Sequence, residues 1–204
     1  AGARMTNSRG ITRRAMLGQL AAAAAFGATA ALAPAGTASA APQKAGPGRL
    51  KQSLSRWTSK APLPELCKRL KSLGFAGVDL LYADEWAVVN DSGLKVTMGY
   101  PAKRDNFIAM GFNDPANHAT LLKELETTIP LAQKAGVTNV ITMFGNRVPG
   151  IDENQARDNC IAGLSKIAQL AAEHGVTVCV ELLNSKVDHH GYQGDSTRFG
   201  VAVM

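Results

Sequence analysis

The feature that most constrains the fold is a repeated order of strand and helix, joined by very short turns. Three helical segments end in the turns KSLGFAG, QKAGV and AEHGV, and each turn leads directly into an apolar strand. A short return of this kind brings every strand back in the same direction, so the order predicts parallel βα units. An eight-stranded barrel and an open doubly wound sheet both have this pattern, and both place function at the carboxyl ends of the strands.

The predicted elements account for most of the chain after residue 50. Strands are predicted at 51–57, 77–81, 95–99, 137–144 and 176–182. Helices are predicted at 63–74, 116–136 and 152–175, with a last one that starts near Asp195. Pro130 is expected to kink or split the second of these helices. The chain lacks the glycine-rich motifs G-x-G-x-x-G and G-x-x-x-x-G-K-[ST], so nothing favours nucleotide binding on an open sheet.

The N-terminal arm has the three-part plan of an export signal. Arg13 and Arg14 precede the apolar stretch AAAAAFGATAALA, which closes on the small-residue pattern Ala38-Ser39-Ala40. We therefore predict a twin-arginine signal peptide at 1–40, a Pro/Gly linker at 41–49, and export to the periplasm or the cell exterior. The alternative is that the stretch stays as a membrane anchor. After cleavage we expect no stable membrane span.

The net charge of +6 belongs to this arm. Residues 1–60 hold nine Lys and Arg and no acid, whereas the remainder has a formal charge of −3. No basic stripe with interleaved aromatic residues follows, so a nucleic-acid partner is not expected. Cys67, Cys160 and Cys179 fit no metal or disulfide spacing and are interpreted as small buried hydrophobic residues. His118 and His174 lie in helical segments and are interpreted as surface residues.

The strand VTVCVEL ends on Glu181, the first candidate functional residue. Side chains alternate along a strand, so Val176, Val178 and Val180 share one face and Glu181 lies on the other. The valines suit the face toward the helices, which aims Glu181 inward at the carboxyl-terminal mouth. A buried carboxylate must be paired, hydrogen-bonded or metal-bound. Glu181 is therefore predicted to be a metal ligand or a proton-transfer base, and the alternative is a salt bridge at the rim.

Several segments together resemble a known family. KQSLSRW, GVDLLYADEW, MGYP, IPLAQKAGVTNVITMFGNR and VTVCVELLNSKVDHHGYQGD are similar to the hydroxypyruvate isomerase-like branch of the xylose isomerase-like TIM barrels, the sugar phosphate isomerase/epimerase superfamily. The resemblance spans about residues 50–204. It implies a (β/α)₈ fold and isomerisation or epimerisation beside the carbonyl of a sugar or hydroxy acid. It also implies a divalent metal, Mg²⁺, Mn²⁺ or Zn²⁺, with Glu181 as its first ligand.

The chain departs from the family pattern in length. A (β/α)₈ barrel needs eight strands and about 250 residues, and the five predicted strands make an incomplete barrel. The other ligands that the family implies, an Asp, a His and a second Glu, belong to strands six to eight. The sequence ends at Met204 within the fifth helical segment, and AGAR precedes Met5. We therefore expect a truncated gene model that is inactive by itself, with an incomplete metal site.

Two alternatives to an active isomerase stay open. The first is a non-catalytic carbohydrate-binding domain or a degenerate barrel fragment. The second is a homo-oligomer in which two copies complete a barrel through their sheet edges.

Six further residues are predicted to contact substrate. Arg56 and Trp57 close the first predicted strand, and Asn184 and Lys186 lie just past Glu181. His189 and His190 follow in a glycine-bearing loop, where the family resemblance implies residues that cover the substrate. Weaker candidates also follow strand ends, at 84–86 and 146–147, whereas Asp79 inside a strand is interpreted as a structural partner.

Overall fold

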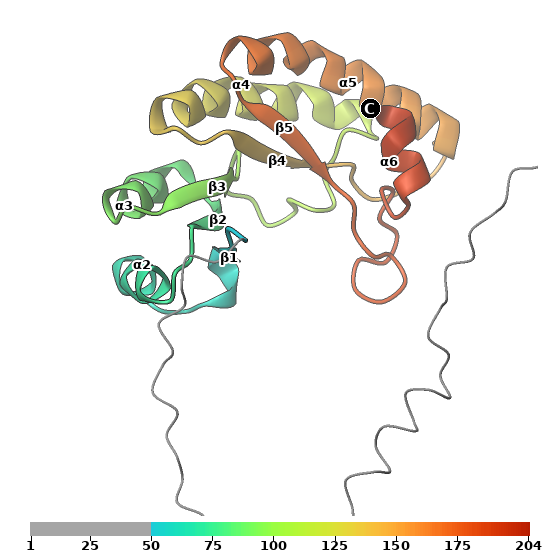
Figure 1. Cartoon of the computed structure of the whole chain (residues 1–204). Helices are drawn as coiled ribbons and strands as arrows, with labels where there is room; N and C mark the ends of the chain where they lie inside the picture. The colour runs from blue at the N-terminus through green and yellow to red at the C-terminus, as the bar shows by residue number, and fades with distance from the viewer. Residues whose placement is uncertain (1–49) are drawn as a thin grey trace, which may run out of the picture. The chain divides into compact units, whose positions relative to one another are not determined.

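The computed structural model describes residues 50–204, which form five βα units on one parallel sheet (Figure 1). The strands follow the sequence order across the sheet: β1 (Ser53–Ser55), β2 (Gly77–Leu81), β3 (Lys95–Gly99), β4 (Asn139–Met143) and β5 (Thr177–Glu181). The predicted signal peptide (1–40) and linker (41–49) lie outside the described residues.

A helix follows every strand. These are α2 (Leu63–Ser72), α3 (Trp86–Asp91), α4 (His118–Ala135), α5 (Glu153–Glu173) and α6 (Thr197–Val203). Three 3₁₀ turns, η1 (Arg56–Thr58), η2 (Ala83–Glu85) and η3 (Pro115–Asn117), join strand ends or loops to helices. Figure 1 shows the helices on the outer side of a curved sheet, which is the arrangement of an incomplete (β/α)₈ barrel and confirms the predicted fold class.

The helix bounds follow from local chemistry. At the start of α5 the Asp152 carboxylate accepts a hydrogen bond from Gln155 N at 2.9 Å, and the Gln155 side chain accepts one from Asp152 N at 3.0 Å. This capping box satisfies two donors that a helix N-terminus otherwise leaves free. The helix ends just before Gly175, whose φ of +62° favours a residue without a Cβ. Ser196 caps α6 by accepting from Phe199 N at 3.2 Å.

The hydrophobic core lies between the sheet and the helices. β4 is the most enclosed strand, and its residues from Val140 to Met143 are all buried. Its neighbour β5 is half-buried, because the described residues place no further strand beside it. The largest fully buried side chains are Trp86, Tyr192, Phe112 and Phe144. Phe144 directly follows β4, and the other three each donate a hydrogen bond to the main-chain oxygen of the last residue of a strand, so the core extends to the edge where the parallel strands terminate.

Four sequence predictions differ from the structure. β1 is shorter than 51–57, because the chain turns into η1 at Arg56. α3 was not predicted, and its six residues are too few for a periodic signal. α4 runs unbroken through Pro130, so the expectation of a split helix is wrong; the carbonyl that loses its helical donor to Pro130 belongs to Glu126, an exposed residue. His118 is buried rather than on the surface, with Nε2 2.9 Å from Phe112 O.

The three cysteines all lie within the described residues and are free thiols. Cys67 and Cys160 are buried free thiols as predicted, and Cys179 is half-buried. β1 and β5 each pair with one strand among residues 50–204, so both present an edge. None of the helices in this range combines the length and the apolar character that crossing a membrane demands.

Candidate active site

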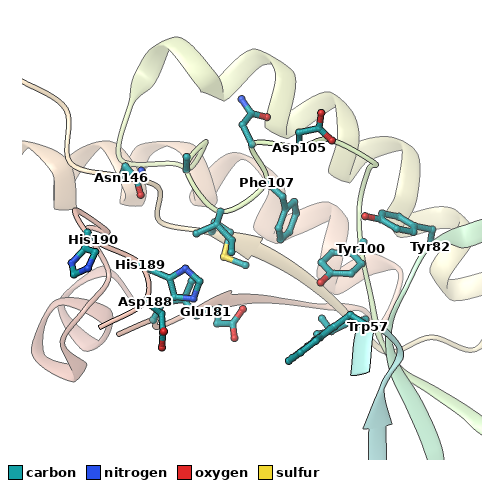
Figure 2. Close-up of a pocket in the computed structure, with 16 residues that line it drawn as sticks. Trp57, Tyr82, Tyr100, Asp105, Phe107, Asn146, Glu181, Asp188, His189 and His190 are labelled. Carbon is teal, nitrogen blue, oxygen red and sulfur yellow. The ribbon is translucent and has the colours of Figure 1, made fainter. Parts of the chain in front are cut away.

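A cavity of about 820 Å³ opens where the strands end (Figure 2). Its walls come from the ends of β2, β4 and β5, from the connection that follows β3, and from the loop that follows β5. The residues that line it include Trp57, Tyr82, Tyr100, Asp105, Asn106, Phe107, Asn146, Glu181, Asp188, His189 and His190. A parallel sheet gathers these segments because all its strands end at the same edge.

Glu181 is the last residue of β5 and lies half-buried in this cavity. Val180, the residue before it, lines a separate apolar groove against α5, as the alternation of the strand predicts. The carboxylate of Glu181 accepts no hydrogen bond from residues 50–204. Burial raises the pKa of Glu181, and the nearby His189 acts in the opposite direction. A carboxyl group with a raised pKa is a better base once ionised, which is the property that proton abstraction needs.

Tyr192 fixes the backbone beneath Glu181. Its side chain is fully buried, and its hydroxyl donates to the Glu181 main-chain oxygen at 2.8 Å. The same hydroxyl accepts from Phe144 N at 3.0 Å, so it joins the ends of β4 and β5. Burial raises the pKa of Tyr192, which keeps the hydroxyl protonated and able to donate. The position of Glu181 thus depends on a residue eleven positions further along the chain.

The loop after β5 is tied to the loop after β4 along its length. Asn146 and Tyr192 form an antiparallel bridge, and Arg147 donates to Tyr192 O at 2.6 Å. Arg147 also pairs with Asp195 at 3.0 Å, and Ser185 donates to the same carboxylate oxygen at 2.6 Å. Residues 188–190, at the tip of this loop, are thereby held at the cavity wall.

Aromatic side chains form the facing wall. The rings of Tyr82 and Tyr100 stack with centroids 5.0 Å apart, and Phe107 meets Tyr100 edge-on at 5.0 Å. Trp57 completes the group and is 73% exposed, so it lies at the rim of the cavity. Burial raises the pKa of Tyr100 to about 12, and the charges of Tyr82, Glu181 and Asp79 add to the effect. Tyr100 is therefore a neutral hydrogen-bonding group at physiological pH.

Four of the seven predicted site residues come together here. Trp57, Glu181, His189 and His190 all line the cavity. Arg56 lies on the other side of the aromatic wall, where it donates to Ser59 O at 2.6 Å and pairs with Glu85 at 3.4 Å. Asn184 and Lys186 line a different depression with Asp195. The role of Arg56, Asn184 and Lys186 in substrate binding stays a prediction.

The sequence reasoning missed most of the aromatic wall. Tyr82 and Tyr100 directly follow β2 and β3, so the rule that selected Glu181 at a strand end also selects them. Asp105, Asn106 and Phe107 come from the long connection after β3, for which no periodic signal exists. Asp79 behaves as expected of a structural residue, because one of its carboxylate oxygens accepts from Ser53 at 2.9 Å. Its other oxygen is buried without a partner.

The possible metal-donor groups of the described residues are dispersed. Among residues 50–204, no group of three or more His, Cys, Asp or Glu side chains lies close enough to hold a metal ion. Glu181 has one imidazole nearby, that of His189, and the acidic side chains of Asp105 and Asp188 are exposed at the rim. These residues alone do not fit a resident metal.

Comparison with known proteins identifies the fold family. The family model of the xylose isomerase-like TIM barrel matches residues 67–200. The chain belongs to the xylose isomerase-like TIM barrel family. This confirms the family that the sequence motifs indicated. No curated protein matches the chain in sequence.

Solved structures of this fold include sugar epimerases. The 3-keto-D-glucoside 4-epimerase of E. coli is 19% identical with a TM-score of 0.54, over 69% of this chain and 59% of its own. The D-psicose 3-epimerase of Clostridium cellulolyticum H10 is 15% identical with a TM-score of 0.55, over 76% and 60%. The IOLI protein, solved with a zinc atom, is 12% identical with a TM-score of 0.60, over 76% and 58%. At these identities the likeness shows the fold, and this xylose isomerase-like chain spans about three-fifths of each of those proteins.

Proposed function

We propose that residues 50–204 form one part of the active site of an isomerase or epimerase that acts on a small sugar or hydroxy acid. The reaction would move a proton on a carbon beside the substrate carbonyl, as in the hydroxypyruvate isomerase-like branch. The observation that carries this proposal is the position of Glu181, which lies half-buried in the cavity where the strands end. The family of the chain and its epimerase neighbours support it.

In this proposal Glu181 is the base. Its ionised carboxylate takes a proton from the hydroxyl-bearing carbon beside the carbonyl, and the electrons move to the carbonyl oxygen to give an enediolate. In an isomerisation the proton then goes to the former carbonyl carbon while a hydroxyl proton passes between the two oxygens, and in an epimerisation a second group protonates the opposite face of the same carbon. Tyr100 and Asn146 line the same cavity and offer hydrogen-bond donors to the substrate oxygens. Tyr192 keeps the base in place through the backbone.

Glu181 is also the residue that we propose as a ligand of a divalent metal, Mg²⁺, Mn²⁺ or Zn²⁺. Carboxylate oxygen suits all three ions, and one neighbour of the same fold was solved with zinc. One ligand with a nearby imidazole binds a metal weakly, so we expect weak binding to this chain. Titration with Mn²⁺, followed by electron paramagnetic resonance, should show still weaker binding to the Glu181→Gln variant. Equal binding by both proteins would remove Glu181 from the metal site.

The test of the function follows deuterium from solvent into the substrate. The protein purified from its own cells is incubated in D₂O with candidate ketoses and hydroxypyruvate, and NMR follows exchange at the carbon beside the carbonyl. Exchange is expected in the wild type and not in Glu181→Gln. Glu126→Gln is the control, because Glu126 is exposed on α4 and its side chain makes no hydrogen bond within the described residues. Normal exchange in Glu181→Gln would refute the proposed role.

The second candidate function is carbohydrate binding without turnover. One observation favours it: of the three carboxylates at the cavity, Asp105 and Asp188 are exposed and Glu181 alone is half-buried. Proton transfer between adjacent carbons commonly uses two placed groups, and residues 50–204 provide one. On this basis we propose that this part of the chain does not turn substrate over by itself. Sugar binding without deuterium exchange would support this candidate, and exchange would exclude it.

We also propose that the protein works after export by the twin-arginine route. The proposal rests on Arg13 and Arg14 with the small-residue pattern at 38–40. The intact mass of the protein from its own cells tests it. Loss of residues 1–40 is the expected result, and a mass that retains them would contradict cleavage.

A further inference from the structure

We infer that the cavity takes a neutral, polyhydroxylated substrate, a free ketose or aldose, in preference to a sugar phosphate or a carboxylate such as a hydroxy acid. This inference rests on the proposed function and narrows its substrate class. It is carried by two features of the cavity walls. These are the sign of the charges that face the cavity and the separation of aromatic from polar side chains.

The charged groups of the cavity are predominantly acidic. Asp105, Glu181 and Asp188 all line it, and no Lys or Arg side chain among residues 50–204 does so. Sites that bind phosphate or carboxylate present Arg, Lys or a cluster of backbone N–H groups to the anion. An anionic substrate would instead meet the half-buried Glu181, where like charges repel more strongly than in water, and the exposed carboxylates of Asp105 and Asp188 at the rim.

The cations around the cavity each have a carboxylate partner. Lys103 pairs with Asp84 at 2.7 Å, Arg56 with Glu85 at 3.4 Å and Arg147 with Asp195 at 3.0 Å. Arg104 pairs with Glu124 and packs on the outer side of Phe107, with its guanidinium carbon 5.0 Å from the ring centroid.

Lys186, the lysine of the loop after β5, lines a separate depression. Recruiting any of the paired cations to an anionic substrate would break an existing ion pair. The surroundings of the cavity therefore do not offset its acidic walls.

The walls also divide by polarity, as Figure 2 shows. Trp57, Tyr82, Tyr100 and Phe107 lie on one side, with the exposed Asp105 beyond Phe107, and Asp188, His189 and Glu181 lie on the other. A sugar has the same division, with a C–H face that packs on aromatic rings and hydroxyl groups that need hydrogen-bond partners. The tilted stack of Tyr82 and Tyr100, 27° between planes, gives a broad apolar surface for such a face.

Matched pairs of ligands test the inference on the full chain. D-fructose is compared with D-fructose 6-phosphate, and dihydroxyacetone with hydroxypyruvate, by saturation-transfer NMR and competition. The measurement is made at pH 8. We expect each neutral ligand to bind at least 10-fold more tightly than its anionic partner.

A charge-introducing variant tests the reason for the preference. Asn106→Arg places a cation on the cavity wall at an exposed loop position and should raise affinity for D-fructose 6-phosphate at least 10-fold. Val187→Arg is the control, because Val187 is 67% exposed on the loop after β5 and does not line the cavity. No gain in Asn106→Arg, or an equal gain in the control, would overturn the charge argument.

The outcomes separate this inference from the proposed function. If the wild type binds the anionic ligand of a pair as tightly as the neutral one, the neutral substrate class is wrong while the isomerase proposal stands. If the wild type binds no ligand of either kind and exchanges no deuterium, the proposed function fails and this inference fails with it.

Discussion

Replacing Tyr192 with Phe should cost this domain a large part of its stability while leaving its shape unchanged. The ring stays in a fully buried site, and only the hydroxyl is lost. That hydroxyl accepts from Phe144 N at 3.0 Å and donates to Glu181 O at 2.8 Å. A buried N–H without an acceptor costs about 1–3 kcal/mol, and the lost bond to Glu181 about 0.5–1.5 kcal/mol. We expect a decrease of about 2–4 kcal/mol in the free energy of unfolding, against a total of about 5–15 kcal/mol for most domains.

Chemical denaturation measures this decrease through the fluorescence of the two tryptophans, Trp57 and Trp86. A domain of this size loses about 2–4 °C of melting temperature per kcal/mol, so heat denaturation should shift by about 4–16 °C. Tyr100→Phe is the control, because the Tyr100 hydroxyl makes no hydrogen bond within residues 50–204, and its change should stay within about 0.5 kcal/mol. Equal midpoints for the two variants would refute the role given to the Tyr192 hydroxyl.

Three further predictions concern titration and assembly. Glu181→Gln should stabilise the fold at pH 7, because burial raises the pKa of Glu181 and the ionised form is costly when folded; unfolding curves should show this gain fading as the pH falls through the raised pKa and nearly absent below the ordinary value of 4.5, and a gain that grows toward acid would contradict it. Asp195→Asn should speed amide exchange at 183–194 above pH 3.8, and the difference should disappear as the pH falls from 3.8 through the lowered pKa of Asp195, which a hydrogen bond from Ser185 and the charge of Arg147 hold below its ordinary value. The two free sheet edges, β1 and β5, should make the purified chain dimerise, and light scattering from a folded monomer would rule this out.

The regular parts of this fold could be predicted from the sequence because each has a local cause. β2 and β3 have the predicted bounds. The apolar run of β2 begins just after a glycine turn, and the run of β3 ends on Gly99. The end of α5 at Gly175 was equally visible, because glycine alone adopts the required positive φ without strain. α3 was invisible, because six residues cannot display a helical period. The burial of His118 was not predicted because it depends on tertiary packing. The ring of Phe112 packs against His118, and so does α5, which is distant in sequence.

From the residues alone the site was predictable where a strand ends, and the family resemblance added the loop residues His189 and His190. Glu181 follows from the alternation of β5 and from the rule that parallel strands present function at their carboxyl ends. The same rule applied to β2 and β3 yields Tyr82 and Tyr100. No sequence rule yields Phe107, which reaches the cavity from a connection without periodicity. Arg56 and Lys186 have the right neighbours in sequence, but Arg56 pairs with Glu85 and Lys186 lines a separate depression, and both outcomes depend on tertiary contacts.

The ties between the loops after β4 and β5 have a consequence for how this protein can change during evolution. Asn146 pairs with Tyr192, Arg147 binds Asp195, and Gln193 N donates to Gly145 O at 2.8 Å. A homologue that replaces one of these loops must replace the other as well, so we expect the two loops to change together. The aromatic wall has no such constraint on Trp57 or Phe107. New substrate preferences should therefore arise first by single replacements on the aromatic side, while the side that holds Glu181 changes rarely and in blocks.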